Sequence, residues 1–252
     1  MKISVITATY NCAKTLRTTL ESLAAQTHSD IEHLVMDGGS ADDTMDLVKG
    51  WTAHQLIWES CKDKGIYDAL NKGIAKASGE IIGFLHADDV LQDSCVLEKI
   101  ATAFEDPAVQ AVYGDLVYVA QEDLTKVIRT WRSAPFHVRL LRLGWMPPHP
   151  TFYARRSLYE RLGGFDLQYR IAADYDNMLR LLSDGNGMGI NAAYIPEILV
   201  RMRTGGVSNR SFRNILQKSR EDLRIARHNC VGGLRTIVMK NLSKIGQFWK
   251  PS

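Results

Sequence analysis

Hydrophobic and polar positions along the chain follow two alternating periods. Short apolar, β-branched runs at residues 3–8, 31–36, 56–60 and 81–85 are typical of buried strands. Between these runs apolar residues recur at helical spacing, in sets that include Leu16 and Leu20, then Met45, Val48 and Trp51, then Leu70, Ile74 and Ala77. Strands that alternate with helices predict an α/β fold, with a largely parallel sheet covered by helices on both faces.

The pattern changes after about residue 110. Residues 110–120 and 126–131 are expected to pair as a hairpin, and a proline-rich passage, WMPPHPTFYA, follows. Two further helices are predicted around residues 155–164 and 173–185, before a strand-like segment at 191–203. We therefore expect a small antiparallel addition to the sheet. Because no repeat or low-complexity linker interrupts the chain, a single compact unit is preferred.

Composition excludes several classes of protein. The chain has 252 residues, of which 45% are hydrophobic and 23% charged, so disorder and a collagen-like structure are ruled out. Its four cysteines are scattered, which excludes a zinc knuckle and a CxxC redox site and is typical of reduced thiols in the cytoplasm. No secretory signal and no 18-residue apolar stretch is present, so an integral membrane protein is not expected.

Charge is distributed unevenly. The net charge is only +3, but residues 208–252 hold 10 Lys and Arg against 2 Asp and Glu, so this tail carries +8 and the rest −5. The tail also carries apolar residues such as Ile225, Val238 and Leu242. Two interpretations stay open: a solvated helix packed on the main body, or an amphipathic surface that contacts anionic lipid.

Acidic residues follow the second and third predicted strands, at the sheet edge where open α/β sheets bind ligands. Asp37 precedes Gly38 and Gly39, which allow a ligand to approach the backbone closely; an ordinary Asp-Gly turn is the alternative. Asp63 is placed to accept hydrogen bonds from a ligand. Lys72, on the helix that follows, is either a ligand contact or half of an exposed pair with Asp68.

Two adjacent carboxylates, Asp88 and Asp89, emerge directly from the buried run IIGFL. They repel each other unless a cation lies beside them, and Mg²⁺ or Mn²⁺ commonly binds through one or two carboxylates together with substrate phosphates. The alternative is capping of the helix that begins near Asp93. His86 is expected to form part of the wall of the site.

Asp174 and Asp176 lie at the start of a predicted helix. Either carboxylate favours the helix dipole whatever its function. Asp174 follows two alanines that leave room for a substrate, so it is the candidate general base. His149 either lines the same cleft or is merely held between prolines. Arg201 and Arg203, with the GGVS loop, either form a phosphate-facing lid or are ordinary surface residues.

In this order, the motifs TATYN, DGGSADDT, DKGIYDALNKGI, ASGEIIGFLHADD, PHPTFYARRSLYERLGGFD and AADYD resemble the family 2 glycosyltransferases of the GT-A fold, and most of all the bacterial subgroup that assembles O-antigen and other surface polysaccharides. The resemblance covers residues 1–208. It implies a GT-A domain over 1–208, with a nucleotide-binding part at about 1–115 and an acceptor-side part at about 116–208, and leaves 209–252 as a basic, amphipathic helical tail.

The resemblance also implies the site. Thr7, Thr9, Asp37, Asp63, Lys72 and Asp88 would bind the nucleotide-sugar donor, Asp89 the Mg²⁺ or Mn²⁺ ion, and Asp174 would be the catalytic base. The aspartate pair matches the family's DXD region but reads ADD. At the position before Asp174, Ala173 replaces the family's usual Glu.

The implied activity is inverting, metal-dependent and non-processive transfer of one sugar, because the QxxRW motif of processive members is absent. A UDP-sugar donor and a glycan or lipid-linked oligosaccharide acceptor are expected, with no nucleic-acid partner. The expected location is the cytoplasm or the cytoplasmic face of the inner membrane, reached through the tail. The alternatives are a sugar nucleotidyltransferase, disfavoured because no glycine-rich loop follows the first strand, and a non-catalytic membrane-associated scaffold.

Overall fold

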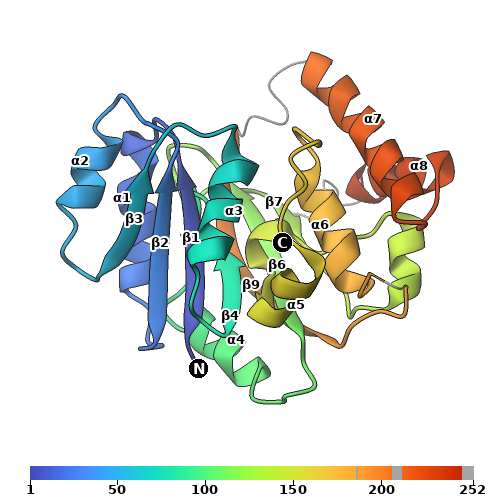
Figure 1. Ribbon diagram of the computed structural model, residues 1–252, viewed down its shortest axis with the longest axis horizontal. Coiled ribbons are helices and arrows are strands. Elements are labelled where there is room, and N and C mark those ends of the chain that lie inside the picture. Colours follow the sequence, from blue (N-terminus) through green and yellow to red (C-terminus); the bar gives the residue numbers. More distant parts are fainter. Residues whose placement is uncertain (186, 206–211, 246–252) are drawn as a thin grey trace.

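The computed structural model describes residues 1–185, 187–205 and 212–245, which form one mixed sheet flanked by helices (Figure 1). Its nine strands follow the order β3-β2-β1-β4-β8-β6-β9-β5, with β7 paired to β6. The strands are β1 (Ile3–Thr9), β2 (Ile31–Asp37), β3 (Leu56–Ser60), β4 (Ile81–Phe84), β5 (Val90–Leu91), β6 (Ala111–Val119), β7 (Val127–Trp131), β8 (Tyr153–Arg155) and β9 (Ala192–Arg203).

The first four strands confirm the predicted parallel sheet. β1 lies between β2 and β4 and pairs with both in parallel, and β3 extends the sheet beyond β2. The connecting helices are α1 (Ala13–Ala24), α2 (Thr44–Lys49) and α3 (Ile66–Lys76). Trp51, expected at the end of the second helix, lies just beyond α2. The carboxyl ends of these parallel strands therefore meet at one edge of the sheet.

The other half of the sheet is mixed. β6 and β7 form the predicted antiparallel hairpin, whereas β9 pairs with β6 in parallel. Two strands were not predicted: β8 lies antiparallel between β4 and β6, and β5 lies antiparallel to β9. Because β8 joins the two halves, both belong to one continuous sheet.

Helices cover both faces of the sheet, as predicted. The remaining helices of the main body are α4 (Val96–Ala103), α5 (Arg156–Leu162) and α6 (Ala173–Leu182), with short 3-10 turns at Val138–Leu143 and His149–Thr151. α3, α5 and α6 pack on one face, against residues such as Ile6 and Phe84, and α1, α2 and α4 cover the other. α3 lies so close to β1 that a Cβ on Gly73 would fall 2.4 Å from Ile6 Cγ2.

The C-terminal segment forms two helices, α7 (Phe212–His228) and α8 (Leu234–Ile245), which lie beside α6 at the right of Figure 1. Ile225, Ala226 and Ile237 are buried in the same hydrophobic cluster as Met178 and Leu179 of α6. The tail thus packs on the main body, as one of the two interpretations held. The predicted boundary at 208/209 lies outside the described residues. No helix of the described residues is long and apolar enough to cross a bilayer.

Candidate active site

Strand register brings three polar residues together at the sheet edge: Thr9 and Asp37, which were predicted, and Ser60, which was not. Thr9 and Asp37 are partners in the β1–β2 pairing, and Asp37 and Ser60 are partners in the β2–β3 pairing. Thr9 Oγ1 donates to Asp37 Oδ1 at 3.0 Å, and Ser60 Oγ donates to Asp37 Oδ2 at 2.6 Å. A one-residue slip in either pairing would separate these side chains.

The Asp37 carboxylate organises the loop that follows it. Besides Thr9 and Ser60, it accepts from the backbone N–H groups of Gly39 and Ser40 and from the Ser40 hydroxyl. Burial tends to raise the pKa of Asp37, but hydrogen bonds from Ser40 and Ser60 outweigh it and hold the pKa below its usual value. Asp37 is buried and these five bonds largely occupy its oxygens, so its predicted nucleotide contact, like that of Thr9, stays a prediction.

Asp63 lies directly over this loop. A Cβ on Gly38 would fall 2.6 Å from Asp63 Oδ2, so only a glycine lets the two loops approach so closely. Asp63 Oδ1 accepts from the N–H of Gly65 at 2.8 Å, and Oδ2 accepts no hydrogen bond from the described residues. Lys72 lies nearby and contacts Cys61 Sγ at 3.1 Å. Its Nζ is 3.8 Å from Asp68 Oδ2, so the ion pair considered as the alternative forms, but both side chains are half-buried rather than exposed.

The two adjacent carboxylates after β4 have different environments. Asp89 has no exposed surface; its Oδ1 accepts from the Arg203 N–H at 3.2 Å, and its Oδ2 has no partner among the described residues. Burial, and next the charge of Asp88, raise the pKa of Asp89 well above its usual value. Asp88 is half-buried, and its carboxylate accepts no hydrogen bond from the described residues. Of the two, Asp88 is therefore the accessible carboxylate.

Asp174 lies in the first turn of α6, as predicted. Its Oδ1 accepts from the Tyr175 N–H at 2.9 Å and from the Tyr67 hydroxyl at 3.4 Å, while Oδ2 accepts from none of the described residues. Tyr67, which the sequence analysis missed, also donates to the Ile171 carbonyl at 2.8 Å. Burial and then the charge of Asp174 raise the pKa of Tyr67, so it remains a donor. The signal in the sequence that could have identified Tyr67 was its position four residues after Asp63, in the first turn of α3.

Two histidines form the wall between the carboxylates. The His86 and His149 rings lie 5.7 Å apart, and His149 stacks on Phe84 at 5.4 Å. Burial lowers the pKa of His86, and the charges of Asp88 and then Asp174 oppose that change. Two carboxylates far apart in the sequence therefore act on the same ring. His86 Nδ1 and His149 Nε2 are buried without a partner among the described residues.

Thr7 does not lie at the edge of the sheet. It has no exposed surface, and its Oγ1 is 3.0 Å from His33 Nε2. Trp51 Nε1 donates to His54 Nδ1, and His54 Nε2 is 3.0 Å from His33 Nδ1. Because indole N–H is only a donor, this chain orders both rings as neutral tautomers with His33 donating to Thr7. The predicted contact between Thr7 and the nucleotide stays untested, and this burial disfavours it.

Arg203 is not the phosphate-facing lid considered above. Its side chain is buried and donates to the carbonyls of Gln121 and Asp88 and to Thr18 Oγ1. These bonds, with the Arg203 N–H on Asp89, fasten β9 to the loop that holds the two carboxylates. Most of the GGVS loop lies outside the described residues.

The residues after β4 fit a divalent cation of the kind that the resemblance implies. No group of three His, Cys, Asp or Glu side chains among the described residues is arranged as a complete metal site. Mg²⁺ and Mn²⁺ need no such group, because one or two carboxylates and substrate phosphates suffice. Asp88, with its unfilled oxygens, and the unpartnered Oδ2 of Asp89 provide that donor set.

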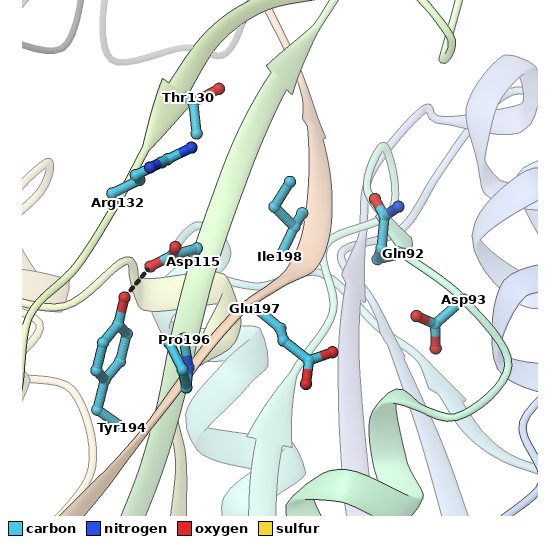
Figure 2. A pocket seen from close by; sticks show the side chains of 9 residues that line it. All are labelled: Gln92, Asp93, Asp115, Thr130, Arg132, Tyr194, Pro196, Glu197 and Ile198. Carbon is cyan, nitrogen blue, oxygen red and sulfur yellow. Dashed lines mark hydrogen bonds between the residues drawn. The ribbon is translucent and has the colours of Figure 1, made fainter. Parts of the chain in front are cut away.

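A polar cavity of about 550 Å³ lies elsewhere, against β6, β7 and β9 (Figure 2). Asp115 is central in it and accepts from the Tyr194 hydroxyl at 2.8 Å. None of the predicted site residues lines this cavity.

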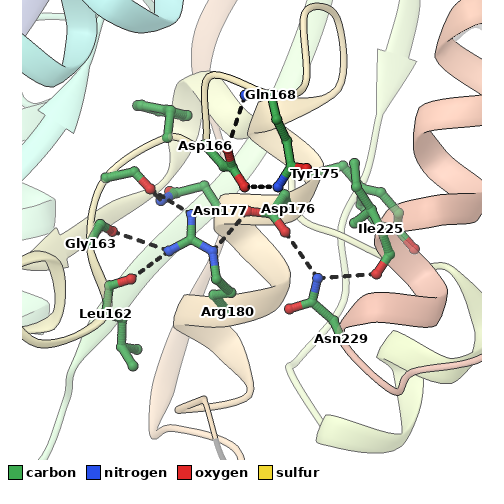
Figure 3. A network of polar contacts seen from close by, with 12 residues as sticks. Leu162, Gly163, Asp166, Gln168, Tyr175, Asp176, Asn177, Arg180, Ile225 and Asn229 are labelled. Atoms are coloured by element: carbon green, nitrogen blue, oxygen red, sulfur yellow. Dashed lines mark hydrogen bonds and ion pairs between the residues drawn. The ribbon is translucent and has the colours of Figure 1, made fainter.

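Asp176 is structural rather than part of the site. It is buried, and its Oδ2 binds Arg180 Nε at 2.8 Å while Oδ1 accepts from Asn229 of α7 at 3.0 Å (Figure 3). Arg180 also donates to the carbonyls of residues 162–164, the turn before the segment that leads to α6. Both partners of Asp176 therefore stabilise α6, the helix that carries Asp174.

Comparison with other sequences gives consistent matches. Residues 4–166 match the family described as Glycosyl transferase family 2. An uncharacterized glycosyltransferase of Mycobacterium tuberculosis is 36% identical over 180 residues, 71% of this chain and 68% of the relative. A PGL/p-HBAD biosynthesis glycosyltransferase of Mycobacterium bovis is 33% identical over 185 residues, 72% of this chain and 70% of the relative.

Solved structures share the fold. The TarS 1–349 structure from S. aureus in complex with UDP-GlcNAc has a TM-score of 0.70 at 18% identity and covers 92% of this chain and 66% of its own. The mannosyltransferase PcManGT of Pyrobaculum calidifontis, in complex with GDP-Man and Mn²⁺, has a TM-score of 0.64 at 19% identity and covers 100% and 76%. At these identities the likeness supports the GT-A-like fold alone.

Proposed function

Because this chain belongs to glycosyltransferase family 2, we propose that it transfers a single sugar from a nucleotide-sugar donor to an acceptor hydroxyl, with inversion at the anomeric carbon. The observation that carries the proposal is the match of residues 4–166 to Glycosyl transferase family 2. The charges of Asp88 and Asp174 both oppose the lowering of the His86 pKa by burial, which is in keeping with two carboxylates near one wall. One carboxylate then lies on the donor side and the other on the acceptor side of a shared wall. The family match favours this activity over a nucleotidyltransferase or an inactive scaffold.

Asp174 is the proposed general base. Its Oδ1 holds both recorded hydrogen bonds, which fix the carboxylate, and its Oδ2 keeps the lone pairs needed to accept a proton. The acceptor oxygen attacks the anomeric carbon as Asp174 takes its proton. The new glycosidic bond forms while the bond to the diphosphate breaks, and the nucleoside diphosphate leaves with the bonding electrons.

The donor is proposed to lie along the edge formed by Asp37, Asp63 and Asp88. Asp63 Oδ2 and the Asp88 carboxylate have unfilled acceptor positions for ribose, base or sugar groups. UDP is the proposed nucleotide, and the UDP-GlcNAc bound to TarS is in keeping with it. Lys72 forms an ion pair with Asp68, so in this proposal its Nζ is shared between that carboxylate and the donor.

We propose that Asp88, rather than Asp89, makes the main contact with the cation. Asp89 was assigned to the metal from the sequence, and this assignment stays untested, but its side chain is fully buried and tied to Arg203. When bound, the cation would offset the charge that develops on the departing diphosphate. Asp89 would hold the loop so that Asp88 faces the donor.

Thermal stability of the full chain against UDP-, dTDP-, GDP- and CMP-sugars, with and without Mn²⁺, identifies the donor. A ligand at 100 times its Kd stabilises the native state by about 2.7 kcal/mol, which gives a clear shift in Tm. Product formation with that donor and a glycan acceptor then tests the chemistry. We expect Asp174→Asn to lower kcat by about 10² to 10⁴-fold while the donor-induced shift remains.

Variants of the carboxylate pair separate their roles. Asp88→Asn should lose the Mn²⁺-dependent part of the donor-induced shift, whereas Asp89→Asn should mainly lower Tm. Asp30→Asn is the matched control, because Asp30 is exposed and its recorded ion pair is with the N-terminus. If Asp174→Asn kept more than about a tenth of wild-type kcat, Asp174 would not be the base. Loss of the Mn²⁺ effect in Asp89→Asn alone would return the cation to Asp89.

The proposed acceptor is a glycan or a lipid-linked oligosaccharide, as in surface-polysaccharide synthesis, reached at the cytoplasmic face of a membrane. The supporting feature is the outer face of α8, where Leu234, Val238 and Leu242 are exposed at helical spacing in a segment of strong positive charge. Apolar side chains and basic residues on one helix favour contact with anionic lipid.

Point substitutions test this contact better than truncation, because removing α7 and α8 would expose core residues such as Met178 and Leu179, which share a hydrophobic cluster with Ile225 and Ile237. We expect a Val238→Gln, Leu242→Gln double variant to lose sedimentation with phosphatidylglycerol vesicles. Leu167→Gln, an equally exposed leucine on the main body, should behave as wild type. Equal sedimentation of all three proteins would remove the membrane contact from the proposal.

A further inference from the structure

The segment just before the proposed base lacks a capping residue of its own. Ala172 is the N-cap of α6 and has no side chain that can accept a hydrogen bond, and Ala173 stands where an acid was expected. Backbone N–H groups at the start of a helix have no partner within the helix, so they need an acceptor from elsewhere. Asp174 provides one acceptor, because its Oδ1 accepts from the Tyr175 N–H, but it accepts from none of the N–H groups of residues 170–172.

A carboxylate from the C-terminal helix α7 binds the N–H of the N-cap residue and of the two residues before it, rather than the N–H groups of the first turn. Glu221 Oε2 accepts from the N–H groups of Ile171 and Ala172, both at 2.9 Å, and Oε1 accepts from the N–H of Arg170 at 3.2 Å. Three successive backbone N–H groups thus converge on one side chain. Hydrogen bonds from backbone N–H to an ionised carboxylate are stronger than those between neutral groups.

The same peptide is held from its opposite side. The Ile171 carbonyl accepts the Tyr67 hydroxyl at 2.8 Å, so Glu221 binds the N–H groups of this segment and Tyr67 binds a carbonyl. Asp174 follows only two residues after Ala172. Its backbone position, and through it the direction of its carboxylate, therefore depends on a helix that the sequence resemblance does not cover.

Glu221 is itself fixed in place. Gln217, one turn earlier in α7, donates from Nε2 to Glu221 Oε1 at 2.9 Å. The neighbouring Asp222 forms a buried ion pair with Lys240 of α8 at 2.8 Å. Asn229, two turns on, bonds to Asp176 of α6, as Figure 3 shows. One face of α7 thus carries a series of polar contacts, and Glu221 is the one that reaches the segment before the base.

We propose that Glu221 is a positioning residue for catalysis: its carboxylate anchors residues 170–172, which lead into α6, and sets the geometry of Asp174 from a distant part of the chain. This inference rests on the proposed role of Asp174 as the base. It gives the C-terminal helices a function in the reaction that is separate from any contact with a membrane. Misplacement of a reacting group by about 1 Å is sufficient to lower a rate by about 10²-fold.

Steady-state kinetics of Glu221→Ala and Glu221→Gln test the proposal, with Asn229→Ala as the matched control. We expect Glu221→Ala to lower kcat by about 10 to 100-fold with the donor KM and the donor-induced Tm shift unchanged, because the donor side is untouched. Glu221→Gln keeps one oxygen as an acceptor and should recover part of kcat. Asn229→Ala also removes a bond between α7 and α6, but not those to residues 170–172, and should leave kcat within about twofold of wild type.

Hydrogen–deuterium exchange gives a readout that does not depend on activity. Amides of residues 170–172 should exchange faster in Glu221→Ala than in wild type or Asn229→Ala, because their acceptor is gone. Faster exchange with unchanged kcat would overturn the catalytic inference, and unchanged exchange would overturn the structural one. If wild type shows the expected protection but transfers no sugar from any donor, the proposed function fails. The role of Glu221 as an anchor of residues 170–172 then still stands.

Discussion

The buried ion pair between Lys240 of α8 and Asp222 of α7 gives a quantitative test of how firmly these two helices are packed together. Lys240 Nζ lies 2.8 Å from Asp222 Oδ1, and the two side chains are only 5% and 4% exposed. Lys240 Nζ also lies 3.2 Å from the centre of the Tyr175 ring, next to Asp174 in the sequence. Burial lowers the pKa of Lys240, and Asp222 opposes that change.

The expected loss of unfolding free energy follows from the desolvation of the two charges. At an effective dielectric constant of about 20, charges this close attract by roughly 6 kcal/mol, most of which offsets the loss of their hydration. Removal of one partner leaves the other charge buried without its opposite charge, so Lys240→Met and Asp222→Leu should each lower the free energy of unfolding by about 3–5 kcal/mol. The Lys240→Met, Asp222→Leu double variant should lie close to wild type, because neither charge then remains.

Urea unfolding followed by far-UV circular dichroism measures all four proteins of this cycle. The expected result is a coupling energy of several kcal/mol between the two positions, with similar m-values. Additive effects of below about 1 kcal/mol for each single variant would mean that water reaches both charges. In that case the contact between α7 and α8 would be open to solvent, and Asp222 would not help to fix α7, the helix that carries Glu221.

Three further changes test other parts of the fold. His33→Gln should flatten the acid side of the stability curve. Burial lowers the pKa of folded His33 to about 3, so between about pH 6.5 and pH 3 the unfolded chain binds a proton that the folded chain excludes. As the pH falls through this range, wild type loses up to about 1.4 kcal/mol of unfolding free energy per pH unit from this group. Gly83→Ala should destabilise by at least about 1–3 kcal/mol, because its Cβ would lie 2.0 Å from the buried Tyr153 ring. Asp37→Asn should cost about 1.5–3 kcal/mol or more in unfolding free energy, since it removes the charge that accepts five hydrogen bonds.

Each of these has a control. His28→Gln is the reference for the pH series, because His28 is only half-buried whereas His33 is fully buried, and slopes that match between His28→Gln and His33→Gln would contradict the burial argument. Gly233→Ala meets nothing within 4 Å and should be harmless. Asp37→Asn is compared with Asp30→Asn, and equal stability of those two would show that the Asp37 bonds contribute nothing.

Local patterns in the sequence were sufficient for the first half of the fold. β1 to β4 and the helices between them form consecutive units whose periodicity is set by burial on the sheet, so apolar spacing predicted them closely. β5 and β8 have two and three residues and exist only because β9, β4 and β6 offer edges to pair with. Such strands depend on tertiary contacts, and the prolines before β8 hid its short apolar run.

The sequence predicted which residue types meet at the site but not what each one does. Asp88 and Asp89 look equivalent in ADD, yet the N–H of Arg203, 114 residues away, helps to bury one and leaves the other accessible. Glu221 looked like one of two acids in a basic tail. Its role depends on how α7 folds back on α6, which is a packing outcome and leaves no local signal.

The number of donors around each carboxylate distinguishes structural acids from those with capacity for a ligand. Asp37 and Asp176 have their oxygens engaged by protein donors, and replacing such a group should be felt chiefly as lost stability. Asp63 and Asp174 each keep one oxygen without a bond from the described residues, and Asp88 keeps two. A half-buried carboxylate retains unfilled oxygens at little cost only where water or a ligand completes them. Asp63, Asp88 and Asp174 lie around the proposed donor and acceptor positions, so their substitution should affect ligand binding and turnover more than folding.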